Sequence, residues 1–168
     1  DTAPQSRQPW EVHINLHGER FLREDVPSVD ERELALEKQP EWRMFIVFDE
    51  GVLQNAPKIT PFWTDAELRD ALGSHPSFLK ADSLAGLAEK MGVDTQTFEQ
   101  TIARYNGFVS DQSDPDFGRE ILPKKIEKPP FYAIHCVGMS VMSPAGVVTD
   151  ETFNVIDQNG QAIPNLYA

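Results

Sequence analysis

The closing quarter of the sequence, residues 129–168, constrains the fold more than any other stretch. It opens on two consecutive prolines, which end any helix or central strand before them. Phe131–Val137 follows, an aromatic and β-branched run with few charges that predicts a buried strand. Near the end, Asn159-Gly160 is the dipeptide that most strongly favours a tight hairpin turn. This part of the chain must therefore be built from strands and turns.

A loop of small residues, Ser143-Pro144-Ala145-Gly146, separates the buried strand from the hairpin. Glycine and small side chains allow a backbone to approach a flat partner closely. Val147–Thr149 and Asn154–Ile156 are short strand candidates before the turn. The last residues, Ile163–Ala168, form an apolar run where chain ends are usually polar. We therefore expect this sequence to be a fragment of a longer protein.

Composition excludes several classes of function. The 168 residues suit one domain, and the net charge of −12 argues against nucleic acid and anionic membrane as partners. The lone Cys136 excludes an internal disulfide and a thiolate-rich metal site. No apolar run reaches the roughly eighteen residues of a membrane span, and no signal-peptide pattern opens the chain. We expect a cytoplasmic protein.

The first half of the chain predicts an arm, two strands and a helix. Residues 1–9 are polar with two prolines and predict a flexible arm, followed by a domain over residues 10–168. Residues 12–16 alternate apolar and polar, which predicts a half-buried strand that turns at Gly18-Glu19 into a return strand. The helix formers of residues 29–39 predict a helix capped by Asp30. Met44–Phe48 predicts a strand buried on both faces.

The clearest helical signal is a pair of helices over residues 82–109. We expect Asp82 to cap the first helix, Gly92 to end it and Asp94 to cap the second. A shorter helix is predicted from Thr64-Asp65 to residue 72. The second helix of the pair carries an apolar stripe typical of core packing, made of Phe98, Ile102 and Tyr105.

Reactive residue types occur, but their patterns favour structural roles. His13 and His17 lie four apart and can hold a metal, yet no third ligand is suitably spaced, so a solvated face of an edge strand is favoured. His135 and Cys136 are neighbours on a strand, so their side chains point to opposite faces and cannot form a dyad.

Two further motifs are incomplete. Residues 138–142 begin like a nucleophile elbow but have Met142 in place of its second glycine. The acidic residues 111–116 lack the glycine and the distal glutamate of a calcium loop, so we expect an acidic connection in which Asp116 pairs locally with Arg119.

Three segments together resemble the substrate-capping domain of the fumarate reductase and succinate dehydrogenase flavoprotein superfamily, with ketosteroid-dehydrogenase-like members. The closing quarter matches the family's PPFYA strand, small-residue loop and hairpin through PPFYAI and VVTDETFNVIDQNGQAIPNLYA. An early segment, INLHGERFLRED, is similar to the family's N..G.RF.NE, with Arg23 where asparagine is usual. The third match combines LAEKMGVD, ARYN and DPDFGR.

The resemblance implies site residues, some of them displaced. Fumarate reductases place a proton-delivering arginine a few residues after the RF segment; that position falls on Ser28 here, and the nearest arginine is Arg32. The competing interpretation of Arg32 is an exposed helix residue paired with acidic neighbours. The family's carboxylate-binding histidine is replaced by Met142, followed by Ser143, which favours a larger and less charged substrate than a dicarboxylate. Ala145-Gly146 would face the flavin, or serve as a plain connector.

These observations predict an α+β fold with a small mixed or antiparallel sheet and the helical pair on one side. The sheet would contain the early hairpin, the central strand and the closing strands. The resemblance implies part of an FAD-dependent oxidoreductase that adds or removes hydrogen across a carbon–carbon bond. Its partners would be its own FAD-binding domain and a small-molecule substrate, since the chain has no dinucleotide-binding glycine motif.

Two other classes remain open. One is a stand-alone acidic α+β interaction module without catalysis, which should lack the exposed apolar patch of an excised capping domain. The other is a metal-dependent hydrolase, which requires His13 and His17 to converge with a carboxylate.

Overall fold

The computed structural model describes residues 7–60, 62–138 and 146–168. Contacts divide the chain into two compact units, residues 1–138 and residues 139–168. A single domain over residues 10–168 therefore stays a prediction. Among the described residues, no helix combines the length and the apolar character that crossing a membrane requires.

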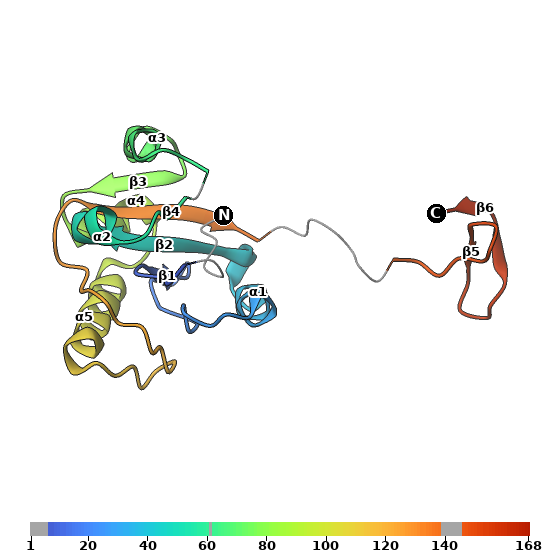
Figure 1. The fold of residues 1–168 in the computed structure, drawn as a ribbon, viewed down its shortest axis with the longest axis horizontal. Helices are drawn as coiled ribbons and strands as arrows, with labels where there is room; N and C mark the ends of the chain where they lie inside the picture. Colours follow the sequence, from blue (N-terminus) through green and yellow to red (C-terminus); the bar gives the residue numbers. More distant parts are fainter. Residues whose placement is uncertain (1–6, 61, 139–145) are drawn as a thin grey trace. The chain divides into compact units, whose positions relative to one another are not determined.

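The larger unit is built on a four-stranded antiparallel sheet in the order β1-β2-β4-β3 (Figure 1). Strand β4 (Phe131–Val137) pairs along its whole length with β2 (Arg43–Asp49) and on its other side with β3 (Phe78–Ala81). The short strand β1 (Val12–Ile14) forms the opposite edge. Both strongly apolar stretches of the sequence are central strands, as predicted.

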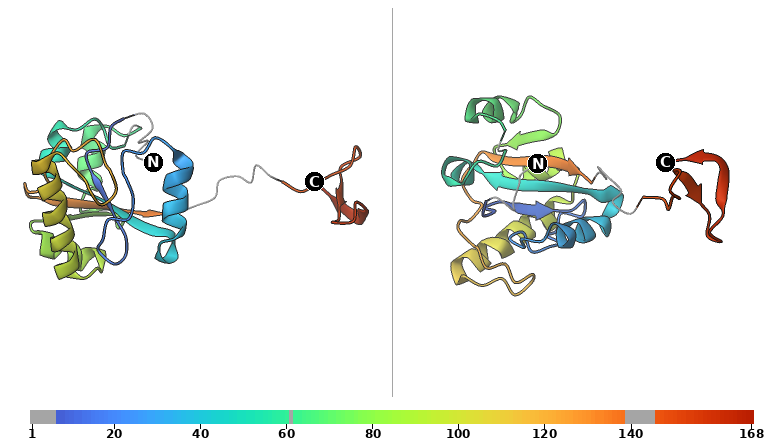
Figure 2. Two further views of the ribbon diagram at one scale, coloured as in Figure 1. Left: turned by 90° about the horizontal axis from the view of Figure 1, so that it is seen from below. Right: turned by 45° about the vertical axis from the view of Figure 1, so that its right-hand side comes forward.

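Helices cover both faces of this sheet (Figure 2). The predicted pair, α4 (Leu84–Met91) and α5 (Thr95–Asp111), packs on one face through its apolar stripe. The other face is covered by α2 (Glu50–Asn55), α3 (Asp65–Ala71) and the connection between them. The fold is therefore mixed α/β with an antiparallel sheet, and the helical pair lies on one side as expected.

Most predicted helix ends are confirmed by their hydrogen bonds. Asp94 caps α5 by accepting the N–H of Thr97 at 2.8 Å, and Gly92 ends α4 in the left-handed conformation with φ of 71°. Two caps are corrected. Ser83 rather than Asp82 caps α4, and Ser28 rather than Asp30 caps α1 (Val29–Glu37). In both cases a serine hydroxyl just before the helix accepts the free N–H of the third helical residue.

Two strand expectations are wrong. The return strand after Gly18 is reduced to a single bridge between Ile14 and Arg20. The predicted closing hairpin exists as β5 (Asn154–Ile156) and β6 (Ala162–Tyr167), with Asp157 closing its turn, but it is a separate two-stranded sheet and not part of the main one. A short helix η1 (Pro40–Trp42) separates α1 from β2.

The packing of α5 gives the first prediction. Phe98 is fully buried against the sheet, so Phe98→Ala should lower the free energy of unfolding by about 3–5 kcal/mol through lost contacts and a residual cavity. Urea unfolding of both proteins measures this difference. Leu34→Ala, at an exposed position of α1, is the matched control and should change it by less than about 0.5 kcal/mol. Equal effects of the two substitutions would contradict the assignment.

Candidate functional site

A buried network of ion pairs lies beside the edge strand β1. The guanidinium of Arg20 donates from Nε and Nη2 to the two carboxylate oxygens of Glu24 at 2.8 and 2.7 Å, and from Nη2 to Asp114 at 2.8 Å. Arg119 adds an ion pair to Glu24 at 3.3 Å. All four side chains are almost completely buried. Because isolated buried charges are very costly, these groups depend on one another.

The same network holds the backbone of the N-terminal segment. Arg119 donates to the carbonyl oxygens of Pro9 at 2.6 Å and Glu11 at 2.9 Å, more than one hundred positions earlier in the chain. The side chain of Glu11 is in turn bound by Arg7. The ring of Tyr105 contacts both guanidinium groups, with those of Arg20 and Arg119 lying 5.4 and 5.3 Å from its centre. The network therefore fastens the chain before β1 to the loop after α5.

The electrostatics of the network favour the ionised carboxylates. Burial alone would raise the pKa of Glu24, but the hydrogen bond from Arg20 and the charges of Arg119 and Arg20 outweigh it and lower this pKa. For Asp114, burial alone would also raise the pKa. The hydrogen bond from Arg20 and the charge of Arg20 outweigh this effect and lower the pKa of Asp114. The expected local pair of Asp116 with Arg119 is wrong: Asp116 binds Arg104 of α5 at 2.6 Å, and Arg119 points into the interior. Asp116 thus pairs with a residue of α5 and not with its neighbour in the sequence.

His13 is the residue that the sequence placed most wrongly. Its predicted position on a solvated strand face is contradicted, because the side chain is only 3% exposed. Both ring nitrogens are buried without a hydrogen-bond partner. Burial lowers the pKa of His13. The negative charges of Glu24 and Glu11 raise it, and the positive charges of Arg119 and Arg32 lower it further. His17 is exposed, and the described residues contain no cluster of three potential metal ligands.

The residues implied by the family resemblance lie at the start of α1 and in the small-residue loop. The hydroxyl of Ser28 accepts the N–H of Glu31 at 3.3 Å as the helix cap. Arg32 lies one turn further on and is half-buried; its Nη1 is buried without a partner, and burial lowers its pKa. Within the described residues Arg32 makes no ion pair.

Of the small-residue loop, only Gly146 is among the described residues. Met142, Ser143 and Ala145 lie outside the described residues. Gly146 is exposed with φ of +56°, and a Cβ atom there would meet nothing within 4 Å. Its conformation, and not a lack of space, therefore favours glycine.

The predicted separation of His135 and Cys136 is confirmed. The imidazole of His135 stacks on Phe45 with ring centres 5.1 Å apart, on the sheet face that carries α4 and α5. Cys136 lies on the opposite face, where burial raises the pKa of its thiol to about 11. A thiol with this pKa is protonated at neutral pH and is a poor nucleophile.

The N-termini of α1, α4 and α5 offer no open site for the phosphates of a dinucleotide. Helix N-termini bind phosphate when their N–H groups are open. Here α1, α4 and α5 are capped by their own side chains, those of Ser28, Ser83 and Asp94. The carboxylate of Asp94 would also repel a phosphate at α5.

Comparisons with known proteins show a consistent relationship. A family model described as FAD binding domain matches residues 12–168. The fumarate reductase (cytochrome) of Shewanella frigidimarina is 31% identical over 93% of this chain, and the 3-oxosteroid 1-dehydrogenase of Mycolicibacterium smegmatis is 26% identical over 98%. The chain spans only 25% and 33% of the length of these two relatives.

A solved structure of similar extent exists. The solution structure of a fumarate reductase flavoprotein subunit from Lactobacillus plantarum superposes with a TM-score of 0.58 at 25% identity. The match covers 81% of this chain and 88% of that one. A chain of about this extent can therefore carry the fold by itself in solution.

The ion network gives the second prediction. Arg20→Met would leave the carboxylates of Glu24 and Asp114 buried without their main counter-ion, so the free energy of unfolding at neutral pH should fall by about 3–5 kcal/mol in urea unfolding. Both carboxyl pKa values are lowered by folding, so this stabilisation is present above pH 4.5, the ordinary pKa of Glu24, and is lost as pH falls below it.

Arg104→Met provides the control. It removes an exposed pair with Asp116 and should cost no more than about 1 kcal/mol. A difference between Arg20→Met and the unaltered chain that does not narrow in acid would contradict the role given to the two carboxylates.

Proposed function

Because the chain belongs to the FAD binding domain family, we propose that it is the substrate-capping part of a longer FAD-dependent oxidoreductase that adds or removes hydrogen across a carbon–carbon bond. The observation that carries this proposal is the family match over residues 12–168 in a chain that spans a quarter to a third of its relatives. In this proposal the remaining part of the protein binds FAD, and the present chain covers the substrate.

The names of the relatives support this reaction class. Two relatives are named as reductases, fumarate reductase and urocanate reductase from Eggerthella lenta. A third is named as a dehydrogenase, 3-oxosteroid 1-dehydrogenase. These names agree with the addition or removal of hydrogen. The molecules in these names differ in size and charge. Met142 and Ser143, in the positions implied by the resemblance, agree better with a larger and less charged substrate than with a dicarboxylate.

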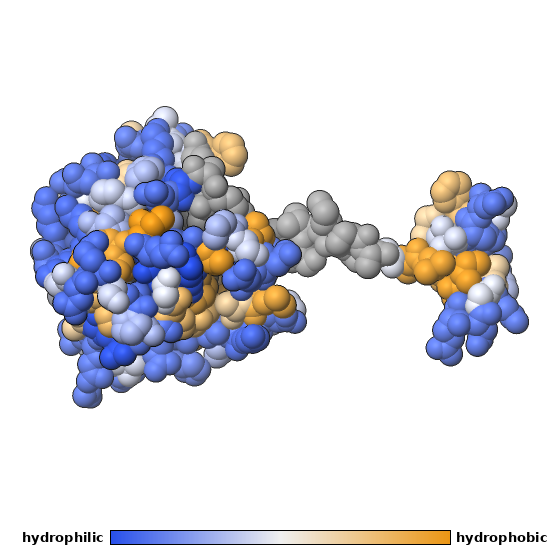
Figure 3. Space-filling model, turned by 60° about the horizontal axis from the view of Figure 1, so that its bottom comes forward, coloured by the Kyte–Doolittle hydropathy of each residue, from blue (hydrophilic) through white to orange (hydrophobic). Residues whose placement is uncertain are grey.

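Exposed apolar surface on the closing hairpin supports a covering role. Every residue of β6 is exposed, and Figure 3 shows the apolar surface of this unit in orange. A two-stranded hairpin without a packed face is marginally stable in water. The apolar side chains that are exposed on this unit are Val147, Val148, Phe153, Ile163, Leu166 and Tyr167. We infer that another layer packs on this hairpin in the longer protein.

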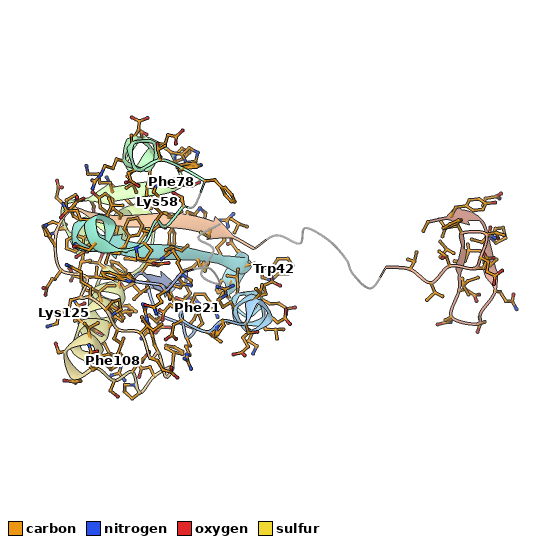
Figure 4. The ribbon with its side chains drawn as sticks, viewed as in Figure 1. Phe21, Trp42, Lys58, Phe78, Phe108 and Lys125 are labelled. Atoms are coloured by element: carbon orange, nitrogen blue, oxygen red, sulfur yellow. The ribbon has the colours of Figure 1, made fainter. Side chains whose placement is uncertain are left out.

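The larger unit exposes a second apolar group around α1 and η1. Trp42 is 55% exposed and lies beside α1 at the end of the sheet (Figure 4), and Leu34 of α1 is equally exposed. Val137, at the end of β4, is also exposed. A stand-alone acidic interaction module has no need of such a surface, so these residues favour a part of a larger enzyme.

Two sets of residues in this chain are proposed to act on the substrate. Arg32, with Ser28 one turn before it on the same side of α1, would present a cation and a hydroxyl to a substrate oxygen and supply a proton. The loop from Met142 to Gly146 would lie closest to the flavin that the rest of the protein holds. Its small residues would let the backbone approach the planar flavin ring.

The third prediction concerns the cofactor. The chain incubated with FAD and then desalted should retain no stoichiometric flavin absorbance, because its helix N-termini are already capped. The longer protein containing this chain should retain FAD and oxidise or reduce an unsaturated substrate with an artificial electron partner. Tight flavin binding by the 168-residue chain, or a longer protein without flavin, would contradict the proposal.

The fourth prediction concerns the small-residue loop. In the longer protein Gly146→Val should lower turnover or flavin affinity at least tenfold, about 1.4 kcal/mol, because a β-branched residue disfavours the positive φ at this position. Gly146→Asn tolerates this conformation and should retain most of the activity.

Gly160→Val is a matched control, since it makes the same change at a positive-φ hairpin turn. Unchanged kinetics and flavin content in Gly146→Val would reduce the loop to a connector.

A further inference from the structure

Three side chains have buried polar atoms without a hydrogen-bond partner in the described part of the chain: His13, Arg20 and Arg32. Arg20 is held by its bonds to Glu24 and Asp114, which leaves His13 and Arg32 to be explained. Both ring nitrogens of His13 and the Nη1 atom of Arg32 are buried and have no hydrogen-bond partner. Buried donors and acceptors are nearly always paired, and each exception destabilises the fold. The two residues come from different elements, β1 and α1, and the charge of Arg32 acts on the imidazole.

The elements that carry the two residues are tied together next to them. Asn15, directly after β1, donates from its side chain to Gln39 at 3.0 Å. Gln39 in turn donates to the carbonyl oxygen of Ala35 in α1 at 3.1 Å. The strand bearing His13 and the helix bearing Arg32 are thus linked by side-chain hydrogen bonds.

The nearest carboxylates cannot serve as partners for His13. Glu24 already receives four hydrogen bonds or ion-pair contacts, from Nε and Nη2 of Arg20, from Arg119 and from the backbone N–H of His13. A carboxylate offers about four acceptor positions, so Glu24 is saturated. Glu11 is occupied by Arg7 and by the backbone N–H of Trp10.

Arg32 and a neutral imidazole are chemically complementary. A guanidinium carries only donors, whereas a neutral histidine has one acceptor nitrogen. The charged groups that act on His13 come from four segments: Glu11 before β1, Glu24 after the turn, Arg119 after α5 and Arg32 in α1. The two glutamates raise the pKa of His13, but burial and the two arginines outweigh them and keep it below its ordinary value. The ring is therefore neutral at pH 7.

We propose that neutral His13 is a positioning residue that accepts the buried N–H of Arg32 and so holds the exposed end of this guanidinium toward a substrate oxygen. Making this bond requires a rotation within the long side chain of Arg32, whose Nη1 is already buried. Protonation of His13 removes the acceptor and places a second cation beside Arg32. The arrangement is therefore intact at neutral pH and is lost in acid. The role toward substrate rests on the proposed function; the hydrogen bond does not.

The experiment follows the arginine side-chain N–H signals of the 168-residue chain by ¹⁵N NMR, with His13 ring signals recorded in the same samples. At about pH 8 the Arg32 N–H should exchange with water about fivefold more slowly than in His13→Leu, the factor for a hydrogen bond of ordinary net strength. At about pH 5 the difference should disappear in the unaltered chain. His13→Gln, which keeps an acceptor but does not titrate, should retain slow exchange at both pH values.

Arg104, which is paired with Asp116 on the exposed side of α5, is the internal control and should not respond to any His13 variant. Arg32→Gln should raise the pKa of His13, because it removes a positive charge that lowers it. Far-UV circular dichroism establishes that each variant is folded.

Equal exchange of Arg32 in the unaltered chain, His13→Gln and His13→Leu would overturn the proposal, as would a His13 pKa that does not change in Arg32→Gln. Since no flavin or substrate is present, these outcomes are independent of those that test the oxidoreductase function. If the hydrogen bond is found, turnover of the longer protein should lose its acid dependence in His13→Gln and fall in His13→Leu.

Discussion

The buried ion network of Arg20, Glu24, Asp114 and Arg119 is the constraint on which the placement of β1 and α1 depends. Strand β1 contributes only three residues to the sheet, which is too little to hold an edge by strand pairing alone. Arg119 supplies the missing connection by binding the backbone just before β1. Because a buried charge without its partner is strongly destabilising, the N-terminal segment and the loop after α5 are stable only when docked together.

The four residues of the network lie in two of the three segments that resemble the flavoprotein family. Arg20 and Glu24 belong to the early segment INLHGERFLRED, and Asp114 and Arg119 belong to DPDFGR. These segments are far apart in the sequence and meet through direct hydrogen bonds in the interior. These four charged residues thus act as a buried scaffold. Similarity in these motifs supports the fold, whereas the chemistry has to be argued from α1 and the small-residue loop.

Local sequence patterns predicted the elements well, and pairings across the fold were not predictable from them. The cap at Asp94, the αL residue Gly92 and the buried strand β2 depend on interactions within a few residues or on continuous apolar runs. By contrast, His13 was assigned to solvent because polar residues in an alternating strand usually are exposed. It is buried because distant residues cover the second face of β1, and alternation along one strand carries no information about them.

The contrast within this polar interior supports the proposed role of Arg32. Arg119 and Glu24 have their hydrogen-bonding capacity filled by fixed partners, so neither can turn toward a ligand without breaking the docking of β1. Arg32 has the opposite character: it lies on a helix that buries none of its residues fully, and one end of its guanidinium has no fixed partner. Fixed buried ion pairs together with a cation that keeps an unpaired N–H agree with the proposed role of Arg32, because the ion pairs fix the backbone while the guanidinium retains a hydrogen bond to donate.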